Sequence, residues 1–353
     1  MEVQTLDNQT EKLAQDWATL KSEEPHLRIR NAAEKLGVSE AELLATTVGT
    51  EATRLNTDWK TFLKRLPELG YVMALTRNDA CVLEHKGKFE KVQVFGKGDH
   101  RIGLVIGPIE ARVFLKSWHV AFAVHQERGD RTLISLQAFD HAGDAIMKVY
   151  LQDDSDEEAY QRLVNDLCSD DQSRSQPVQA YDAPNFNPNP DKAAFLKDWA
   201  ALKDTHDFFP MLKNHNVHRH HAVKLAEGQF TERFPVENLE PLLEKAAKDK
   251  LPIMIFAGNR GNIQIHQDVV RTIRMLDRGG ARWLNVLDPE FNMHLRTDLL
   301  TEAWVVVKPT EDGIVTAIEC YDQHGELMVQ FFGLRKPGIP ELEDWRELVK
   351  AFG

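Results

Sequence analysis

The chain repeats its own sequence at a fixed offset. Residues 16–21 (DWATLK) match residues 198–203 (DWAALK), an offset of 182 positions. Residues 139–143 (FDHAG) match residues 321–325 (YDQHG) at the same offset of 182. A single offset that relates both ends of a domain-sized segment indicates a tandem duplication. The chain must therefore fold as two homologous halves.

A stretch with the composition of a linker separates the halves. Residues 173–190 are rich in Ser, Gln, Asn and Pro, and an acidic run at 153–158 precedes them. Such a composition favours an extended, exposed segment. We predict a first repeat over residues 1–170, a linker over 171–190 and a second repeat over 191–353.

Each half is predicted to be α+β. Apolar residues recur at helical spacing within residues 10–65, and Ser39 with Glu42 forms a capping-box pattern. Helices followed by strands predict N-terminal helices and a large antiparallel sheet, and two such halves can leave a ligand cleft between them. Short β-type runs, separated by Gly, Asn and Asp, are expected at 71–75, 81–83, 92–95, 102–106, 111–115, 120–124, 133–139 and 146–151.

The charge balance excludes several classes of partner. The chain has 353 residues, with 43 basic and 55 acidic side chains and a net charge of −12. This balance disfavours nucleic acids and anionic membranes, and a helix-turn-helix outline around Gly37 lacks a basic recognition face. The sequence has neither a secretion signal nor an apolar run of about 20 residues, so we expect a cytoplasmic protein that is not membrane-embedded.

A histidine-containing stretch carries the first hint of chemistry. Residues 204–212 (DTHDFFPML) place His206 among aromatic side chains, with a basic cluster following at 217–221 (VHRHH). A neutral imidazole can ligate iron if a neighbour such as Asp204 fixes its tautomer. The alternative is an ordinary helix start capped by Asp204 or Thr205. At the offset of 182, His206 lies opposite a glutamate, so the first half is expected to lack the histidine.

Other catalytic chemistries lack their sequence patterns. Residues 259–262 (NRGN) do not end in the Lys-Ser/Thr of a phosphate-binding loop, so we predict a tight turn between strands. No His-Glu-x-x-His zinc motif and no Gly-x-Ser-x-Gly nucleophile elbow occurs. Cys81, Cys168 and Cys320 lack paired metal-binding spacing and are expected to be reduced.

An ordered set of motifs resembles a known family. Residues 204–209 (DTHDFF), 258–266 (GNRGNIQIH), 308–309 (KP) and 330–335 (QFFGLR) resemble the cytoplasmic hemin-degrading and hemin-transport proteins of bacterial haem uptake, the HemS/ChuS type. The resemblance extends over essentially the whole chain. It implies haem, iron protoporphyrin IX, as substrate or cargo in the cleft between the halves.

The resemblance also implies roles for individual residues on both faces of haem. His206 matches the axial iron ligand, with His218, His220 and His221 as fallback ligands. The alternative for those three is a solvated helix face. Arg112 matches a catalytic distal residue, beside Phe114; strand alternation predicts that residues 112 and 114 share a face, and the alternative for Arg112 is a surface position.

The remaining implied residues hold the porphyrin. Guanidinium and ammonium groups suit the two propionates because they form charge-assisted hydrogen bonds with carboxylates. Scattered surface charge and ordinary core packing are the alternatives for these residues. The resemblance assigns propionate binding to Arg219, Lys308, Arg335 and Gln330, and the apolar walls to Phe256 and Phe332.

Three functions remain open at this point. The resemblance implies oxidative opening of the haem ring to release iron for iron acquisition, with electrons from an external donor, because no flavin or nicotinamide motif is evident. The second is a non-catalytic carrier that passes haem from an inner-membrane importer to a separate haem oxygenase. The third is a duplicated interaction module without a cofactor.

Overall fold

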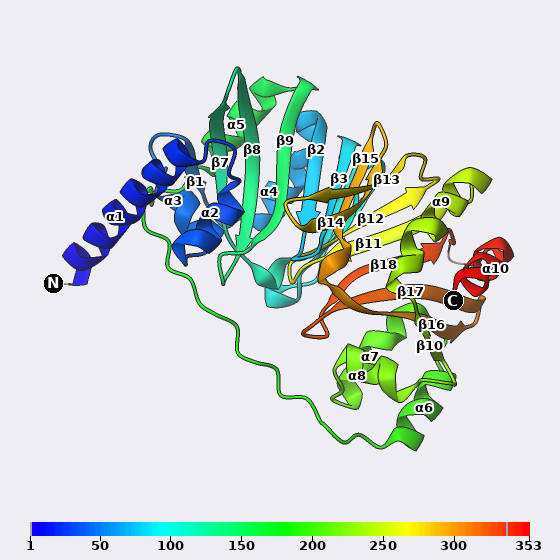
Figure 1. The fold of residues 1–353 in the computed structure, drawn as a ribbon. Coiled ribbons are helices and arrows are strands. Elements are labelled where there is room, and N and C mark those ends of the chain that lie inside the picture. Colours follow the sequence, from blue (N-terminus) through cyan, green and yellow to red (C-terminus); the bar gives the residue numbers. More distant parts are fainter. Residues whose placement is uncertain (1, 337) are drawn as a thin grey trace. The chain divides into compact units, whose positions relative to one another are not determined.

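A computed structural model describes residues 2–336 and 338–353, and the chain divides into two compact units. Unit 1 comprises Met1–Arg77, Glu84–Asp182 and Asn259–Ile263; unit 2 comprises Asn78–Leu83, Ala183–Gly258 and Gln264–Gly353 (Figure 1). Each unit therefore takes a short segment from the other half of the sequence. No helix in the described residues is long and apolar enough to span a bilayer.

Unit 1 has the predicted order of helices followed by strands. Its elements are α1 (Glu2–Glu23), α2 (Ile29–Leu36), α3 (Glu40–Ala45), β1 (Ala52–Leu55), α4 (Trp59–Arg65), η1 (Leu66–Leu69), β2 (Gly70–Arg77), β3 (Cys81–Lys88, whose first residues belong to unit 2), β4 (Lys91–Phe95), η2 (Gly98–His100), β5 (Ile102–Ile106), β6 (Glu110–Phe114), η3 (Leu115–Ser117), β7 (Trp118–Arg128), β8 (Arg131–Asp140), β9 (Ala145–Ser155) and α5 (Glu157–Leu167).

Unit 2 repeats this order of α-helices and strands; the two units differ only in their short 3-10 helices. Its elements are α6 (Lys192–Ala200), η4 (Thr205–Asp207), α7 (Phe208–Asn214), α8 (Arg219–Leu225), β10 (Thr231–Phe234), η5 (Val236–Asn238), α9 (Leu239–Asp249), β11 (Ile253–Gly258), β12 (Asn262–Asp268, whose first residues belong to unit 1), β13 (Ile273–Arg278), β14 (Ala281–Leu287), β15 (Phe291–Arg296), η6 (Thr297–Leu299), β16 (Leu300–Thr310), β17 (Gly313–Asp322), β18 (Leu327–Gly333) and α10 (Glu343–Phe352).

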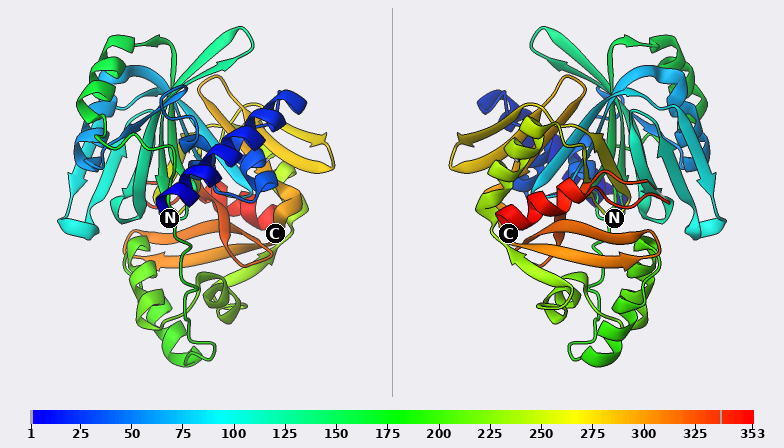
Figure 2. Two further views of the ribbon diagram at one scale, coloured as in Figure 1. Left: turned by 90° about the vertical axis from the view of Figure 1, so that its left-hand side faces the viewer. Right: turned by 90° about the vertical axis from the view of Figure 1, so that its right-hand side faces the viewer.

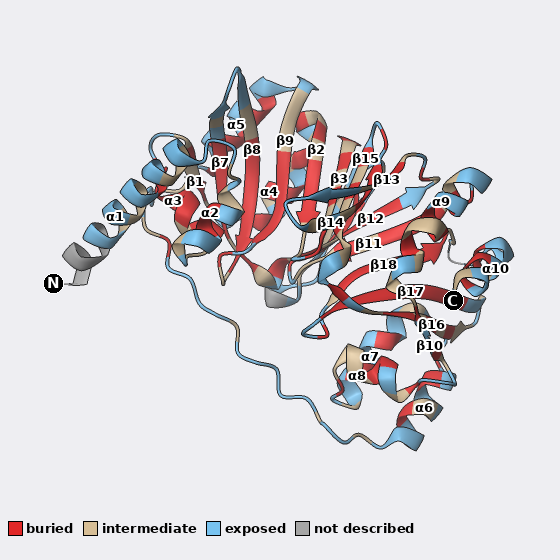
Figure 3. Ribbon diagram, viewed as in Figure 1, coloured by how far each residue is buried: buried red, intermediate tan, exposed pale blue. Residues whose placement is uncertain are grey.

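The strand pairing of the two units is equivalent and antiparallel. Neighbouring strands follow the order β1-β7-β8-β9-β2 in unit 1 and β10-β16-β17-β18-β11 in unit 2. The strands β4-β5-β6 and β13-β14-β15 also pair antiparallel in matching order. The predicted α+β duplication is therefore confirmed, and Figure 3 shows that much of β7, β8, β16 and β17 is buried.

The large sheet of unit 2 uses its two faces differently. Trp304, Val306 and Tyr321 pack against α6, α7 and α8, which lie below the orange strands β16 and β17 in both views of Figure 2. Ile318 and Cys320 pack with α9 and α10 in a separate core cluster. Alternation along β17 sends successive side chains to these opposite faces. The face that α6–α8 cover only in part carries the candidate site.

The sequence-based predictions missed two elements, β1 and α5, and placed one turn correctly. Strand β1 lies inside the stretch that helical spacing assigned to helices. Helix α5 begins in the acidic run, where the side chain of the N-cap residue Asp156 accepts the backbone N–H of Ala159. Glu157 and Glu158 occupy the first turn, where the helix dipole favours acidic side chains. Residues 259–262 form the predicted tight turn, closed by a 2.8 Å bond from Asn259 N to the carbonyl of Asn262.

The segment between α5 and α6 has no helix or strand, yet both ends are anchored. In unit 1, Nη2 of Arg54 donates to the carbonyls of Ser173 and Ser175 at 3.0 and 2.9 Å. In unit 2, the backbone N–H of Asn187 donates to the carbonyl of Asn216 at 2.7 Å. Hydrogen bonding therefore restrains the predicted linker at its ends, although most of it is exposed (Figure 3).

Candidate functional site

His206 lies in η4, immediately before α7, with an orientation fixed by Asp204. The Asp204 carboxylate accepts the backbone N–H of His206 at 2.8 Å and contacts its Nδ1 at 2.6 Å. These bonds lower the pKa of Asp204 below its usual value, the backbone bond most of all. Nδ1 is therefore the protonated nitrogen, which leaves the lone pair on Nε2. The His206 side chain is 89% exposed, so Nε2 is available to a ligand.

Four side chains of unit 2 converge on the fully buried carboxylate of Glu319 in β17. Arg219 of α8 donates from Nε to Oε2 at 2.9 Å and from Nη2 to Oε1 at 2.6 Å. Lys308 of β16 and Gln330 of β18 each donate to Oε1 at 3.0 Å, and the Tyr321 hydroxyl donates to Oε2 at 2.6 Å. Three of the predicted propionate-binding residues therefore meet at one point.

Electrostatics make this Glu319 cluster a positively charged site. Burial alone would raise the pKa of Glu319, but Arg219 and then Lys308 outweigh it and hold the carboxyl ionised. Burial lowers the pKa of Lys308 to about 8; Glu319 opposes that shift and Arg219 adds to it. Two cations share one carboxylate, so near neutral pH the cluster keeps an uncompensated positive charge that can attract an anionic group.

Phe208 connects the Glu319 cluster to the stretch that carries His206. It is buried, and its ring centroid lies 4.3 Å from Nζ of Lys308 and 5.2 Å from Cζ of Arg219. Phe208 also contacts Trp199 edge-on, with ring centroids 4.8 Å apart. The indole N–H of Trp199 donates to the carbonyl of Val307 at 2.9 Å. The start of α7 is therefore fixed directly behind His206.

An apolar patch continues from the Glu319 cluster along the same strands. Phe256 and Phe332 contact each other with ring centroids 5.0 Å apart, and Met254 with Ala317 completes part of this patch. Phe256 lies directly opposite Gln330 in the sheet register, so both side chains occupy one face. The two predicted wall residues and the predicted polar donors are neighbours on unit 2.

Two predicted groups lie outside this arrangement. Arg335 follows the end of β18, and its Nη2 lies 4.0 Å from a carboxylate oxygen of Asp312 rather than at the Glu319 cluster. Among the fallback ligands, His220 Nε2 lies 2.9 Å from Glu302 and its ring stacks on Tyr321. Nε2 of His218 is 3.9 Å from a glutamate, and His221 is partly buried on α8.

Arg112 and Phe114 lie on β6 of unit 1 and share one face of the strand, as alternation predicted, while Val113 is buried in the core. Nη2 of Arg112 donates to a carboxylate oxygen of Glu110 at 3.0 Å. Phe114 lies opposite Ile102, whose side chain is 45% exposed. This face therefore presents a guanidinium beside exposed apolar surface.

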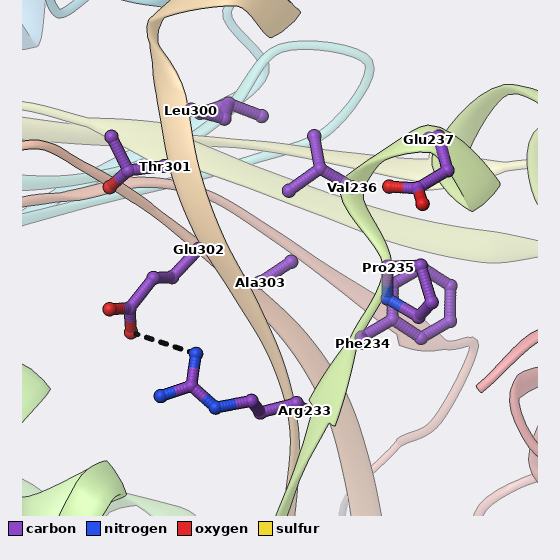
Figure 4. A pocket seen from close by; sticks show the side chains of 9 residues that line it. All are labelled: Arg233, Phe234, Pro235, Val236, Glu237, Leu300, Thr301, Glu302 and Ala303. Atoms are coloured by element: carbon purple, nitrogen blue, oxygen red, sulfur yellow. Dashed lines mark ion pairs between the residues drawn. The ribbon is translucent and has the colours of Figure 1, made fainter.

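A pocket of about 400 Å³ lies elsewhere on unit 2 (Figure 4). It is lined by residues 233–237 and 300–303, where Arg233 points toward Glu302 at 4.0 Å. Glu302 also bonds Lys224 and His220, and these bonds outweigh burial and lower the pKa of Glu302 to about 2. None of the predicted site residues lines this pocket, and its Arg233 and Glu302 are already paired with each other.

Sequence reasoning missed Glu319 and Tyr321, and the offset of 182 does not hold at the second α-helix of each half. The sequence signal for Glu319 was an acidic residue within the otherwise apolar, strand-like run at residues 314–321. Helices α2 and α7 begin at Ile29 and Phe208, so the offset has fallen to 179 there, and the connection after α1 (residues 24–28) is shorter than that after α6 (residues 201–207). Exposed His26 lies in the corresponding connection of the first half, two residues beyond the glutamate that the offset of 182 places opposite His206.

Comparison with known proteins places this geometry in a family. The model of the haemin-degrading HemS/ChuX domain matches residues 37–167 and again residues 216–352. The hemin transport protein HmuS of Yersinia pestis is 33% identical over 341 residues, covering 96% of each chain.

Solved structures of two similar proteins superpose on nearly the whole of this chain. Holo-PhuS, a haem-binding protein from Pseudomonas aeruginosa, superposes with a TM-score of 0.93 at 45% identity, covering 98% of this chain and 99% of PhuS. The haem-degrading enzyme ChuS of Escherichia coli O157:H7 superposes with a TM-score of 0.89 at 32% identity, covering 97% and 99%. The chain belongs to the HemS/ChuX family, whose domain it carries twice.

Proposed function

We propose that this chain is a cytoplasmic haem-binding protein of iron acquisition that opens the haem ring oxidatively and releases iron. The observation that carries the proposal is the arrangement on unit 2. An exposed imidazole with a carboxylate on Nδ1 lies two residues from Phe208, which contacts a cationic cluster beside an apolar patch. Haem needs these three things: a ligand for iron, donors for propionates and an apolar wall for the ring.

Each group has a defined task in this proposal. His206 binds iron through Nε2, and Asp204 keeps the proton on Nδ1 and makes the imidazole a stronger donor. Arg219, Lys308 and Gln330 bind the propionates, and Phe256 with Phe332 packs on the porphyrin. Donor chemistry and the shared sheet face of Lys308, Gln330, Phe256 and Phe332 support these assignments.

The remaining residues serve the distal side and the rim of haem. Arg112 acts as the catalytic distal residue, where its guanidinium orders the reacting oxygen species and Phe114 contacts the ring. Arg335, which lies 4.0 Å from Asp312, is a peripheral propionate donor. Bound haem supplies the redox chemistry, and an electron donor outside the chain supplies the electrons.

The alternative function is a carrier that takes haem from an inner-membrane importer and delivers it to a haem oxygenase. Its support is the name of HmuS, a hemin transport protein, whereas ChuS is described as a haem-degrading enzyme. The same haem site serves both functions, because each requires iron ligation and propionate binding.

Turnover separates the two functions. The chain is loaded with hemin without oxygen, then given a reductant and dioxygen with catalase present, while the Soret band and tetrapyrrole products are followed. We expect loss of the Soret band together with an open-chain tetrapyrrole and free iron. A Soret band that persists, with intact haem passing to an acceptor protein, would identify a carrier.

Hemin affinity is expected to fall in alkaline solution because Lys308 loses its proton. Burial holds the pKa of unliganded Lys308 at about 8, and a propionate favours its charged form. Between pH 7 and pH 9 the affinity should therefore fall roughly 10-fold, the change in the protonated fraction across that pKa. Binding titrations in a pH series measure this, with Lys308→Met as the control that should show no such drop. An equal drop in Lys308→Met would exclude Lys308 as the group responsible.

A further inference from the structure

We infer that Glu319 is a positioning residue for haem: it aims the propionate donors and, through Phe208, restrains the segment that carries the axial histidine. This inference rests on the proposed haem site. Glu319 does not itself bind the ligand, because its carboxylate is buried and accepts five hydrogen bonds from four side chains. Its effect must therefore pass through the groups that it holds.

The donors held by Glu319 keep hydrogen-bonding capacity for a ligand. Arg219 commits Nε and Nη2, and an arginine has five N–H groups in total. Lys308 commits one of its three N–H groups, and Gln330 commits one of its two. A carboxylate at the centre thus fixes three side chains in direction while leaving each able to donate again.

Glu319 also sustains the charge of the site. Burial and the neighbouring Arg219 both lower the pKa of Lys308, and the Glu319 carboxylate is the group that opposes them. Glutamine at position 319 would remove that opposing charge, so Lys308 would lose its proton at a lower pH. The change would weaken the binding of a ligand carboxylate in two ways: the donor side chains would be less well oriented, and Lys308 would carry less positive charge.

The connection to His206 runs through Phe208. The Phe208 ring is contacted by Lys308 at 4.3 Å and by Arg219 at 5.2 Å, and both cations bond Glu319. Phe208 is the first residue of α7 and follows His206 by two positions. A shift of the two cations would therefore move the helix start behind the axial ligand. Propionate binding and iron ligation are coupled by this contact.

Unit 1 contains a counterpart that serves as a matched control. Glu40 is the first residue of α3, as Arg219 is the first residue of α8, and it is buried. Its carboxylate pairs with Arg77 and Lys148, and these partners outweigh burial and lower its pKa to about 2. Both units thus bury a carboxylate between two cations, but only the cluster around Glu319 contains predicted haem-binding residues.

The test compares hemin with its dimethyl ester, which lacks charged carboxylates, in the full chain. Wild-type protein should bind hemin at least about 10-fold more tightly than the ester, equivalent to about 1.4 kcal/mol. In Glu319→Gln this preference should fall below about 3-fold, and the axial-ligand absorption bands should shift with both ligands. Glu40→Gln should keep the full preference and the wild-type bands.

The outcomes separate this inference from the proposed function. Wild-type protein without a preference for hemin over the ester would overturn the propionate site itself. A wild-type preference that persists undiminished in Glu319→Gln would overturn the positioning role alone. If Glu319→Gln does not fold, Tyr321→Phe removes the 2.6 Å bond to Oε2 and leaves the carboxylate in place. It should reduce the preference in the same direction, and an unchanged preference in Tyr321→Phe would reject the inference.

Discussion

Replacing His206 with alanine is expected to remove the imidazole signature from the absorption spectrum of the hemin-loaded protein. Hemin affinity should fall by at least about 10-fold. Loss of a hydrogen-bond partner of a metal-ligating histidine already costs about that much, and loss of the histidine itself should cost no less. The structure gives a reason for choosing this histidine: its Nδ1 is engaged by Asp204 at 2.6 Å, while its ring is 89% exposed. Hemin titration and the axial-ligand spectrum measure both effects.

A matched control lies at the other end of α7. His215 at the end of α7 also contacts a carboxylate, with Nε2 at 2.8 Å from Asp198, but its side chain is only 16% exposed. His215→Ala should leave the axial-ligand spectrum unchanged. An imidazole signature that survives in His206→Ala and disappears in His220→Ala would move the ligand role to the fallback histidine on α8.

Replacing Arg219 with methionine is expected to destabilise the chain by about 3–5 kcal/mol, the cost of leaving a buried charge without its partner. The Glu319 carboxylate is fully buried and would lose its two shortest contacts with a cation, at 2.6 and 2.9 Å. Because Lys308 remains as a counter-charge, the effect should lie toward the lower end of that range. Chemical denaturation of the ligand-free protein measures the change in the free energy of unfolding.

A surface ion pair provides the comparison for the stability effect of Arg219→Met. Arg65 bonds Glu68 and Asp166, whose side chains are 45% and 66% exposed, so Arg65→Met should cost only about 0–1 kcal/mol. Adding Glu319→Gln to Arg219→Met should restore part of the lost stability, because the unpaired charge is removed. A double variant that is no more stable than Arg219→Met would show that Arg219 acts mainly through packing.

Much of the fold was predictable because duplication and alternation can be recognised directly in the sequence. The β-type runs predicted between Tyr71 and Leu151 lie within strands, except that Leu115 falls one residue beyond β6, and the Ser39–Glu42 capping box formed with bonds of 3.2 and 2.8 Å. The four-residue strand β1 was missed because it is too short to show alternation. Helix α5 was missed because its capping acids were taken for a charged loop.

The site was less predictable because its central group depends on tertiary burial. Resemblance supplied Arg219, Lys308 and Gln330, but only the folded sheet shows that all three donate to Glu319. A charged residue in a strand can face solvent or a buried partner, and periodicity cannot distinguish these. Arg335 was grouped with the donors, yet the chain leaves the sheet after β18 and carries it to Asp312.

The crystal structure of the hemin-loaded chain tests the central claim most directly. We predict iron bonded to Nε2 of His206, Asp204 still on Nδ1, and propionates accepting from Arg219 and Lys308. Glu319 should remain buried beneath these donors. Iron bonded to a different side chain, or propionates bound away from the Glu319 cluster, would contradict the account.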